Sequence, residues 1–140
     1  MRISDFIHAH PAAVRILYKL KGPDRIILIT DCMRAGGMPD GNYTLGDLAV
    51  TVKDGIARTD SGALAGSTLT ILSAVKNMRH TLGITINEAV KMASAVPAKA
   101  LGVFDRVGDI CEGKYADIIA LDEDLNLRFV MIGGHVKISL

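Results

Sequence analysis

The stretch "LITDCMRAGG", residues 28–37, places an aspartate directly after a short apolar run and before a loop that contains Gly36 and Gly37. The apolar run, residues 26–29, is too short for a helix and is flanked by turn-forming residues, so it predicts a strand that is buried on both faces. Asp31 then lies at the carboxyl end of this strand, where α/β proteins gather ligands and catalytic residues. Asp31 is therefore a candidate catalytic residue, and a turn or capping role is the alternative.

Helical patterns lie on both sides of this strand. Residues 11–21 begin with a proline, repeat apolar residues at helical spacing and end before Gly22, which predicts a helix that leads into the strand. Residues 68–82 return to helical spacing after the strand. A further helix begins with Thr85 and Glu88, whose separation of three residues is that of a capping box. This alternation of strand and helix predicts an α/β fold.

An antiparallel hairpin is expected between the first strand and the helix that follows it. Residues 48–53 and 56–59 alternate apolar and polar side chains. They flank Asp54-Gly55, a dipeptide that is a strong signal for a tight hairpin turn. We therefore expect two strands that are inserted between strand and helix.

The C-terminal third has a different pattern. Short β-type runs occur at residues 116–122 and 127–140, and we expect the second run to form one strand that bends at the glycine pair 133–134. A second unit is therefore expected there, which gives two domains, over residues 1–104 and 105–140.

Composition excludes several classes of partner. The 140 residues are 49% hydrophobic, with 16 basic and 15 acidic side chains and a net charge of +1, so no electrostatic attraction to nucleic acid or to an anionic membrane is expected. No apolar run reaches the roughly 18 residues that span a bilayer, and no secretory signal pattern is present. The two cysteines form no disulfide pattern. A cytoplasmic protein without a membrane or nucleic-acid partner is expected.

Three segments carry a resemblance to a known family. Residues 29–70 hold a Thr-Asp pair, then M-x-x-x-G and a "LAGS" loop; residues 88–102 read "EAVKMASAVPAKALG" and residues 113–122 read "GKYADIIALD". In this order and spacing, they resemble the C-terminal portion of the N-acetylglucosamine-6-phosphate deacetylases, a family of the amidohydrolase superfamily. The resemblance covers nearly the whole chain. Phe6 departs from it, because the family reads like D-G-I-H-V where this chain has "DFIHA".

The resemblance implies both a fold and a reaction. Residues 1–104 would be the last strands and helices of a metal-dependent-hydrolase β/α barrel with an inserted β-hairpin, and residues 105–140 would be the C-terminal strands of a small β-sandwich. The reaction would be hydrolysis of the N-acetyl amide of N-acetylglucosamine 6-phosphate, a small-molecule substrate, to acetate and glucosamine 6-phosphate. Family members are much longer, so we expect this chain to be a fragment, inactive by itself.

The resemblance also assigns roles to residues. Asp31 would be the catalytic acid and base that moves a proton between the attacking water and the leaving amine. His8 would face the phosphate end of the sugar. The substrate-binding residues would be Asp5, Phe6, Ile7, His8, Leu64, Ala65 and Gly66.

A divalent metal ion, zinc or similar, is implied for the full-length family and not for this chain. The implied ligands, a glutamate and two histidines, belong to the part that the chain lacks. His8-Ala-His10 is an H-x-H sequence that could chelate a metal along a strand. The superfamily's H-x-H lies far upstream of the catalytic aspartate, however, so His10 is interpreted as a helix-entry residue and no metal is expected to bind here.

Two other functions remain open. The chain could be a truncated, non-catalytic domain that associates with itself, or an amidohydrolase that acts on a cyclic amide. The "LAGS" loop with the D-x-x-H segment favours deacetylation over cyclic-amide hydrolysis. Because strands taken from a barrel keep open edges, and because relatives form homodimers by family resemblance, a homo-oligomer, most simply a dimer, is expected.

Overall fold

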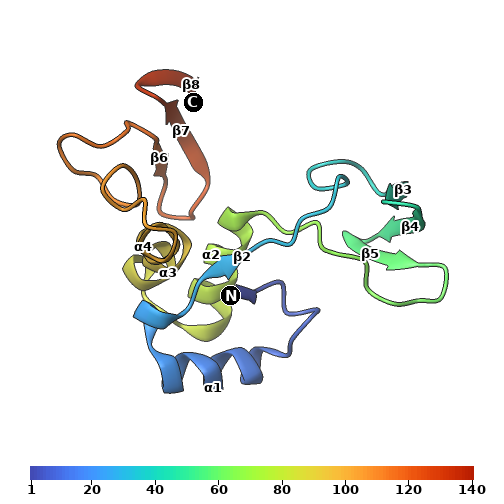
Figure 1. The fold of residues 1–140 in the computed structure, drawn as a ribbon. Helices are drawn as coiled ribbons and strands as arrows, with labels where there is room; N and C mark the ends of the chain where they lie inside the picture. Colours follow the sequence, from blue (N-terminus) through green and yellow to red (C-terminus); the bar gives the residue numbers. More distant parts are fainter.

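A parallel strand pair lies at the centre of the chain, in a computed structural model that describes residues 1–140 (Figure 1). Strands β1 (Arg2–Ile3) and β2 (Leu28–Ile29) pair in parallel, and α1 (Pro11–Lys21) connects them, followed by the short 3-10 helix η1 (Pro23–Arg25). Parallel neighbours need such a crossover because both strands run in one direction. The predicted central strand is confirmed, although it is short, and β1 was not predicted.

The chain has four α-helices, and the first three of them build the larger core around this pair. Besides α1 these are α2 (Ile71–Leu82), α3 (Ile86–Ala93) and α4 (Ala95–Ala100). None has the length and apolar character that crossing a bilayer requires. The buried residues of this core come from α1, β2, α2, α3 and the loops between them: Val14, Ile26, Leu28, Leu69, Ala74, Val75, Met78, Ile84, Ala89 and Met92.

Capping hydrogen bonds fix where the helices begin and end. The backbone N–H of Gly22 donates to the Tyr18 carbonyl at 2.8 Å, which ends α1 where predicted. The predicted helix at 68–82 begins later, because the Thr70 hydroxyl caps it and Ile71 is its first residue. Both hydrogen bonds of the predicted capping box are present at the start of α3. Helix α4 was not predicted because it contains Pro97, which is tolerated there in the first turn.

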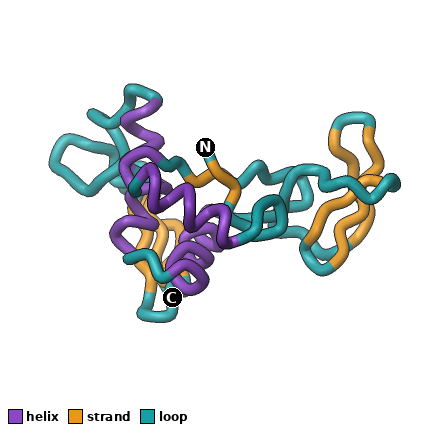
Figure 2. Tube along the Cα trace, turned by 90° about the horizontal axis from the view of Figure 1, so that it is seen from below, coloured by secondary structure: helices purple, strands orange, loops and turns teal.

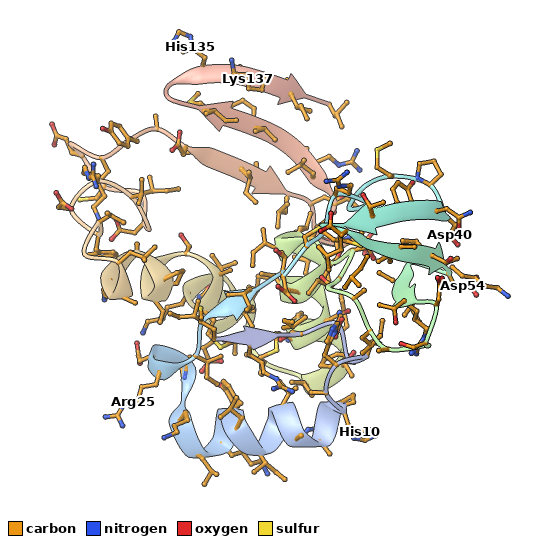
Figure 3. All side chains as sticks on the ribbon, turned by 45° about the vertical axis from the view of Figure 1, so that its right-hand side comes forward. His10, Arg25, Asp40, Asp54, His135 and Lys137 are labelled. Atoms are coloured by element: carbon orange, nitrogen blue, oxygen red, sulfur yellow. The ribbon has the colours of Figure 1, made fainter.

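A three-stranded antiparallel sheet projects from the helices (Figures 1 and 2). It consists of β3 (Gly41–Leu45), β4 (Leu48–Lys53) and β5 (Ile56–Thr59). The predicted hairpin is confirmed, since Asp54 and Gly55 have φ of +52° and +70°, the signs of a type I′ turn. The Asp40 carboxylate accepts both backbone N–H groups of this turn, and Figure 3 shows Asp40 and Asp54 close together. The additional strand β3 was not predicted.

A second antiparallel sheet ends the chain. Its strands are β6 (Ile118–Leu121), β7 (Leu127–Ile132) and β8 (His135–Ser139). The expectation of one bent strand over 127–140 was wrong. Gly133 and Gly134 have φ of +55° and +78°, so they form a two-residue turn that reverses the chain. The strand direction therefore changes at this pair, and β8 pairs with β7.

Candidate active site

Asp31 lies just beyond β2, two residues after its last paired residue, and is exposed. Its φ of +50° is a left-handed conformation that aspartate adopts more readily than most residues. The Asp31 carbonyl accepts the backbone N–H of Ser67 at 2.9 Å, and the Met33 N–H donates to the Ser67 carbonyl at 2.9 Å. Cys32 and Ser67 thereby form a parallel bridge. The segment after β2 and the "LAGS" loop are therefore joined side by side.

A cleft of about 230 Å³ opens beside this bridge. The segment after β1, the turn between β4 and β5, residues 64–69 and the start of α2 form its walls. Five of the eight residues that were selected from the sequence line this cleft. Asp31 does not line it, but its carbonyl accepts the N–H of Ser67, which does. The five are Asp5, Ile7, His8, Leu64 and Gly66.

Besides Asp31, two selected residues lie outside the lining. Phe6 packs against the helical core, and the buried Ala65 packs in a second core cluster with Met33 and Val50. Their neighbours in sequence line the cleft, so Phe6 and Ala65 hold the two loops in place from behind. The structure thus brings both predicted substrate segments to one cleft and assigns these two residues to packing.

Asp5 and His8 form a hydrogen-bonded pair in the cleft wall. Asp5 Oδ2 lies 2.7 Å from His8 Nδ1, and Asp5 Oδ1 accepts the backbone N–H groups of Ile7 at 3.0 Å and His8 at 3.1 Å. Burial opposes ionisation of the Asp5 carboxyl, but the hydrogen bonds from His8 and Ile7 outweigh it and lower its pKa below the usual value. Asp5 is therefore held as a carboxylate, with hydrogen bonds to both of its oxygens.

Backbone conformation explains two residues of these loops. Gly66 has a φ of +65°, and a Cβ built on it would lie 3.2 Å from the Asp31 carbonyl oxygen. Only glycine meets both conditions without strain. Phe6 has a φ of +62°, although it carries an aromatic side chain where the family resemblance has glycine. The resemblance therefore departs at a position whose backbone still favours glycine.

Polar residues of α2 also reach the cleft, and the sequence analysis missed them. Ser73 and Asn77 line it from the first two turns of the helix. Asn77 Nδ2 donates to the Ser4 carbonyl at 2.7 Å, which fastens α2 to the end of β1. Their separation of four residues places both on one helical face, and this spacing was the signal that could have identified them.

The remaining histidines have structural positions. His10 Nδ1 accepts the Ala12 N–H at 3.2 Å and caps α1, which confirms its interpretation as a helix-entry residue (Figure 3). His80 lies in the last turn of α2 and His135 begins β8. No three His, Cys, Asp or Glu side chains are grouped so that they could hold a metal ion. The residues of this chain therefore do not fit a metal centre of their own.

Comparison with known proteins defines the class. Residues 7–137 match the model of the Amidohydrolase family, and the chain belongs to that family. Its members generally use a divalent metal ion.

Within the family, the similarity is to deacetylases of amino sugar phosphates. The chain is 45% identical over 134 residues to the N-acetylglucosamine-6-phosphate deacetylase of Vibrio furnissii, covering 96% of this chain and 33% of that protein. It is 46% identical to the N-acetylgalactosamine-6-phosphate deacetylase of Escherichia coli O157:H7, covering 96% of this chain and 35% of that protein.

A solved structure is similar over almost the whole chain. It is an aspartate-to-alanine mutant of the Mycobacterium smegmatis N-acetyl-D-glucosamine-6-phosphate deacetylase, in complex with N-acetyl-D-glucosamine-6-phosphate. The TM-score is 0.90 at 36% identity, and the match covers 98% of this chain and 37% of that one. The chain thus spans about a third of the length of these three proteins.

Proposed function

We propose that this chain is the C-terminal part of a metal-dependent amidohydrolase that deacetylates N-acetylglucosamine 6-phosphate. The observation that supports the proposal is the bridge between Cys32 and Ser67, which joins the segment that carries Asp31 to a loop of the cleft that both predicted substrate segments line. The similarity to deacetylases of amino sugar phosphates supports the same substrate class.

Asp31 is proposed to move the proton that amide hydrolysis requires. Water adds to the amide carbon and loses a proton, and the departing amine must gain one before the carbon–nitrogen bond breaks. A carboxylate next to the reacting amide can accept the first proton and donate it to the nitrogen, which is worth about 100-fold to 10,000-fold in rate. The exposure of Asp31 at the end of β2 leaves its side chain free to reach a substrate.

The cleft is proposed to hold the sugar phosphate. His8 would contact the phosphate, and the loop at Leu64 and Gly66 would contact the sugar ring. The relatives include deacetylases named for the glucosamine and for the galactosamine substrate, which differ in the configuration of one hydroxyl. Of the two sugars, we propose N-acetylglucosamine 6-phosphate as the substrate, because both the Vibrio and the Mycobacterium relatives are named for it.

The chain's strands are proposed to complete a larger fold. Residues 1–104 would supply the last strands and helices of a β/α barrel, and residues 105–140 would supply strands of a β-sandwich. The metal ligands would lie outside this chain, in the part of the relatives that it does not cover. We place the protein in the cytoplasm, in keeping with its two free cysteines, Cys32 and Cys111.

Self-association is proposed for the chain by itself. Its accessible surface is 8776 Å², whereas a compact monomer of 14.9 kDa has about 7,000 Å². The difference of about 1,800 Å² exceeds the roughly 800 Å² that each partner contributes to a standard interface. Exposed apolar side chains of the terminal sheet belong to this surface, among them Ile119, Ile132, Val136 and Ile138. A homodimer is the simplest assembly that covers them.

A chimera tests the proposed function. This chain would replace the matching third of the Vibrio furnissii relative, and acetate release from N-acetylglucosamine 6-phosphate and N-acetylgalactosamine 6-phosphate would be measured. We expect turnover of the glucosamine substrate by the chimera and none by the chain alone, since the proposed metal ligands lie outside it. A folded, metal-loaded chimera that releases no acetate from either sugar would contradict the proposal.

A further inference from the structure

The geometry of the cleft points to a role for Asp5 that differs from substrate contact. We propose that Asp5 is a positioning residue that fixes the tautomer of His8, so that a phosphate group binds only when His8 also carries a proton on Nε2. This inference rests on the proposed function, in which His8 faces the phosphate. It reassigns Asp5 from a substrate-binding residue to one that acts through its neighbour.

The Asp5 carboxylate presents little surface to a ligand. Its side chain is only 7% exposed, and its two oxygens face His8 Nδ1 and the backbone N–H groups of Ile7 and His8. An anionic substrate would also be repelled by an uncovered carboxylate. Because the Asp5 oxygens are covered by their own segment, the group that remains available to a ligand is the ring of His8, whose side chain is 24% exposed.

The two nitrogens of His8 differ in what they offer to a ligand. A carboxylate accepts hydrogen bonds and cannot donate them, so the 2.7 Å contact with Asp5 Oδ2 requires a proton on Nδ1. In neutral His8 the other nitrogen, Nε2, then has only a lone pair. Phosphate oxygens are acceptors too, and a neutral His8 offers them nothing. Only the doubly protonated ring can donate to phosphate through Nε2 while it still donates to Asp5.

No other side chain that lines the cleft can gain or lose a proton near neutral pH. Asp5 and His8 are the only charged or titratable side chains that line it. The turn between β4 and β5 contributes Gly55, Ile56 and Ala57, and α2 contributes the uncharged Ser73 and Asn77. His8 is therefore the lining side chain through which pH would act on phosphate binding.

The variant Asp5→Asn separates this role from simple packing. Its amide oxygen can still accept the N–H groups of Ile7 and His8, so the loop keeps its shape. The amide nitrogen replaces Oδ2 and donates to Nδ1, which forces the proton of neutral His8 onto Nε2. Asp5→Asn thus reverses the tautomer and makes the neutral ring a donor to phosphate. The matched control is His8→Gln, which removes the imidazole.

The experiment records ¹⁵N NMR spectra of the histidine rings in the intact 140-residue chain at about pH 8.5, above the usual imidazole titration range. His8→Gln identifies the His8 signals by their loss. We expect the Nδ1–H form in the unmodified chain and the Nε2–H form in Asp5→Asn. The same tautomer in both proteins, or Nε2–H in the unmodified chain, would overturn the role of Asp5.

Calorimetric titration with N-acetylglucosamine 6-phosphate, and with N-acetylglucosamine as the uncharged comparison, then tests the coupling to binding. The titrations run from about pH 7 to about pH 8.5, where the sugar phosphate stays a dianion because its second pKa is about 6. We expect affinity to fall with rising pH in the unmodified chain, by up to about tenfold per pH unit, and to stay level in Asp5→Asn.

The two measurements distinguish failure of the coupling between His8 and phosphate from failure of the proposed function. Equal pH slopes in the two proteins would overturn the coupling between phosphate and His8. Absence of binding to either protein would count against the proposed function, whereas the tautomers alone decide the role of Asp5.

Discussion

The backbone N–H of Ser67 donates to the carbonyl oxygen of Asp31 at 2.9 Å, and this bond fastens the loop that lines the cleft to the end of β2. Ser67 is buried, and its hydroxyl also donates to the carbonyl of Thr30. Two bonds from one residue therefore set the position of Asp31 relative to the cleft.

Gly66→Ala tests the close approach of the two loops. The alanine must adopt the left-handed backbone conformation of Gly66, and its methyl carbon would lie 3.2 Å from the Asp31 carbonyl oxygen. Gly62→Ala is the matched control, because Gly62 has a φ of +84° with open space around it. We expect Gly66→Ala to lower the free energy of unfolding by about 1 to 3 kcal/mol more than the control, measured by urea denaturation. Equal losses would mean that the loops are less tightly joined than described.

Phe6 tests whether the backbone after β1 favours glycine. Phe6→Gly and Phe6→Ala both remove the ring that packs against the helical core. Alanine normally stabilises a chain relative to glycine, but at a φ of +62° the order should reverse. We expect Phe6→Gly to be more stable than Phe6→Ala by about 1 kcal/mol in thermal or urea unfolding. The opposite order would show that Phe6 leaves the left-handed region in solution.

The lowered pKa of Asp5 predicts that the stability of the chain depends on pH. Its pKa is lowered in the folded chain, despite opposing burial, because it accepts hydrogen bonds from His8 and Ile7. A depressed carboxyl pKa stabilises the folded state above the ordinary value of 3.8, and the contribution is lost as pH falls through the folded-state pKa below it. The stability difference between the unmodified chain and Asp5→Asn should therefore shrink between about pH 6 and about pH 2.5.

Urea denaturation across this pH range measures the difference. Asp47→Asn, in the exposed turn between β3 and β4, controls for the change in net charge. A difference between the unmodified chain and Asp5→Asn that stays constant with pH would contradict the stabilising role of the Asp5 carboxylate.

Sequence patterns predicted the elements whose signals are local. The capping box of Thr85 and Glu88, the proline at the start of α1 and the Asp54-Gly55 turn each depend on residues close together in the chain, and each was confirmed. The glycine pair 133–134 was recognised as a break but interpreted as a bend. A turn and a bend share the same local signal, and only the pairing of β7 with β8 distinguishes them.

Features that depend on distant contacts were not predictable in the same way. Strand β1 has two residues and exists because β2 lies beside it, so no periodicity could indicate it. The cleft was only partly anticipated. The family resemblance selected Asp5, His8 and the "LAGS" loop, but the contribution of Asn77 depends on how α2 packs against the end of β1.

Self-association is a prediction of the exposed surface. At micromolar concentration, gel filtration with light scattering should give a mass of at least twice 14.9 kDa. Ile138→Lys places a charge on the exposed apolar side of the terminal sheet and should shift the population toward the monomer. A single monomeric species with cooperative unfolding would show that the chain needs no partner to cover its apolar surface.

The turnover number of the Vibrio chimera with and without Asp31→Asn shows whether Asp31 transfers the proton. Asparagine tolerates the φ of +50° and keeps the size of the side chain, so the substitution removes the proton-transfer group and little else. We expect kcat for N-acetylglucosamine 6-phosphate to fall at least about 100-fold while KM changes little. An unchanged kcat in a folded, metal-loaded variant would contradict the catalytic role of Asp31.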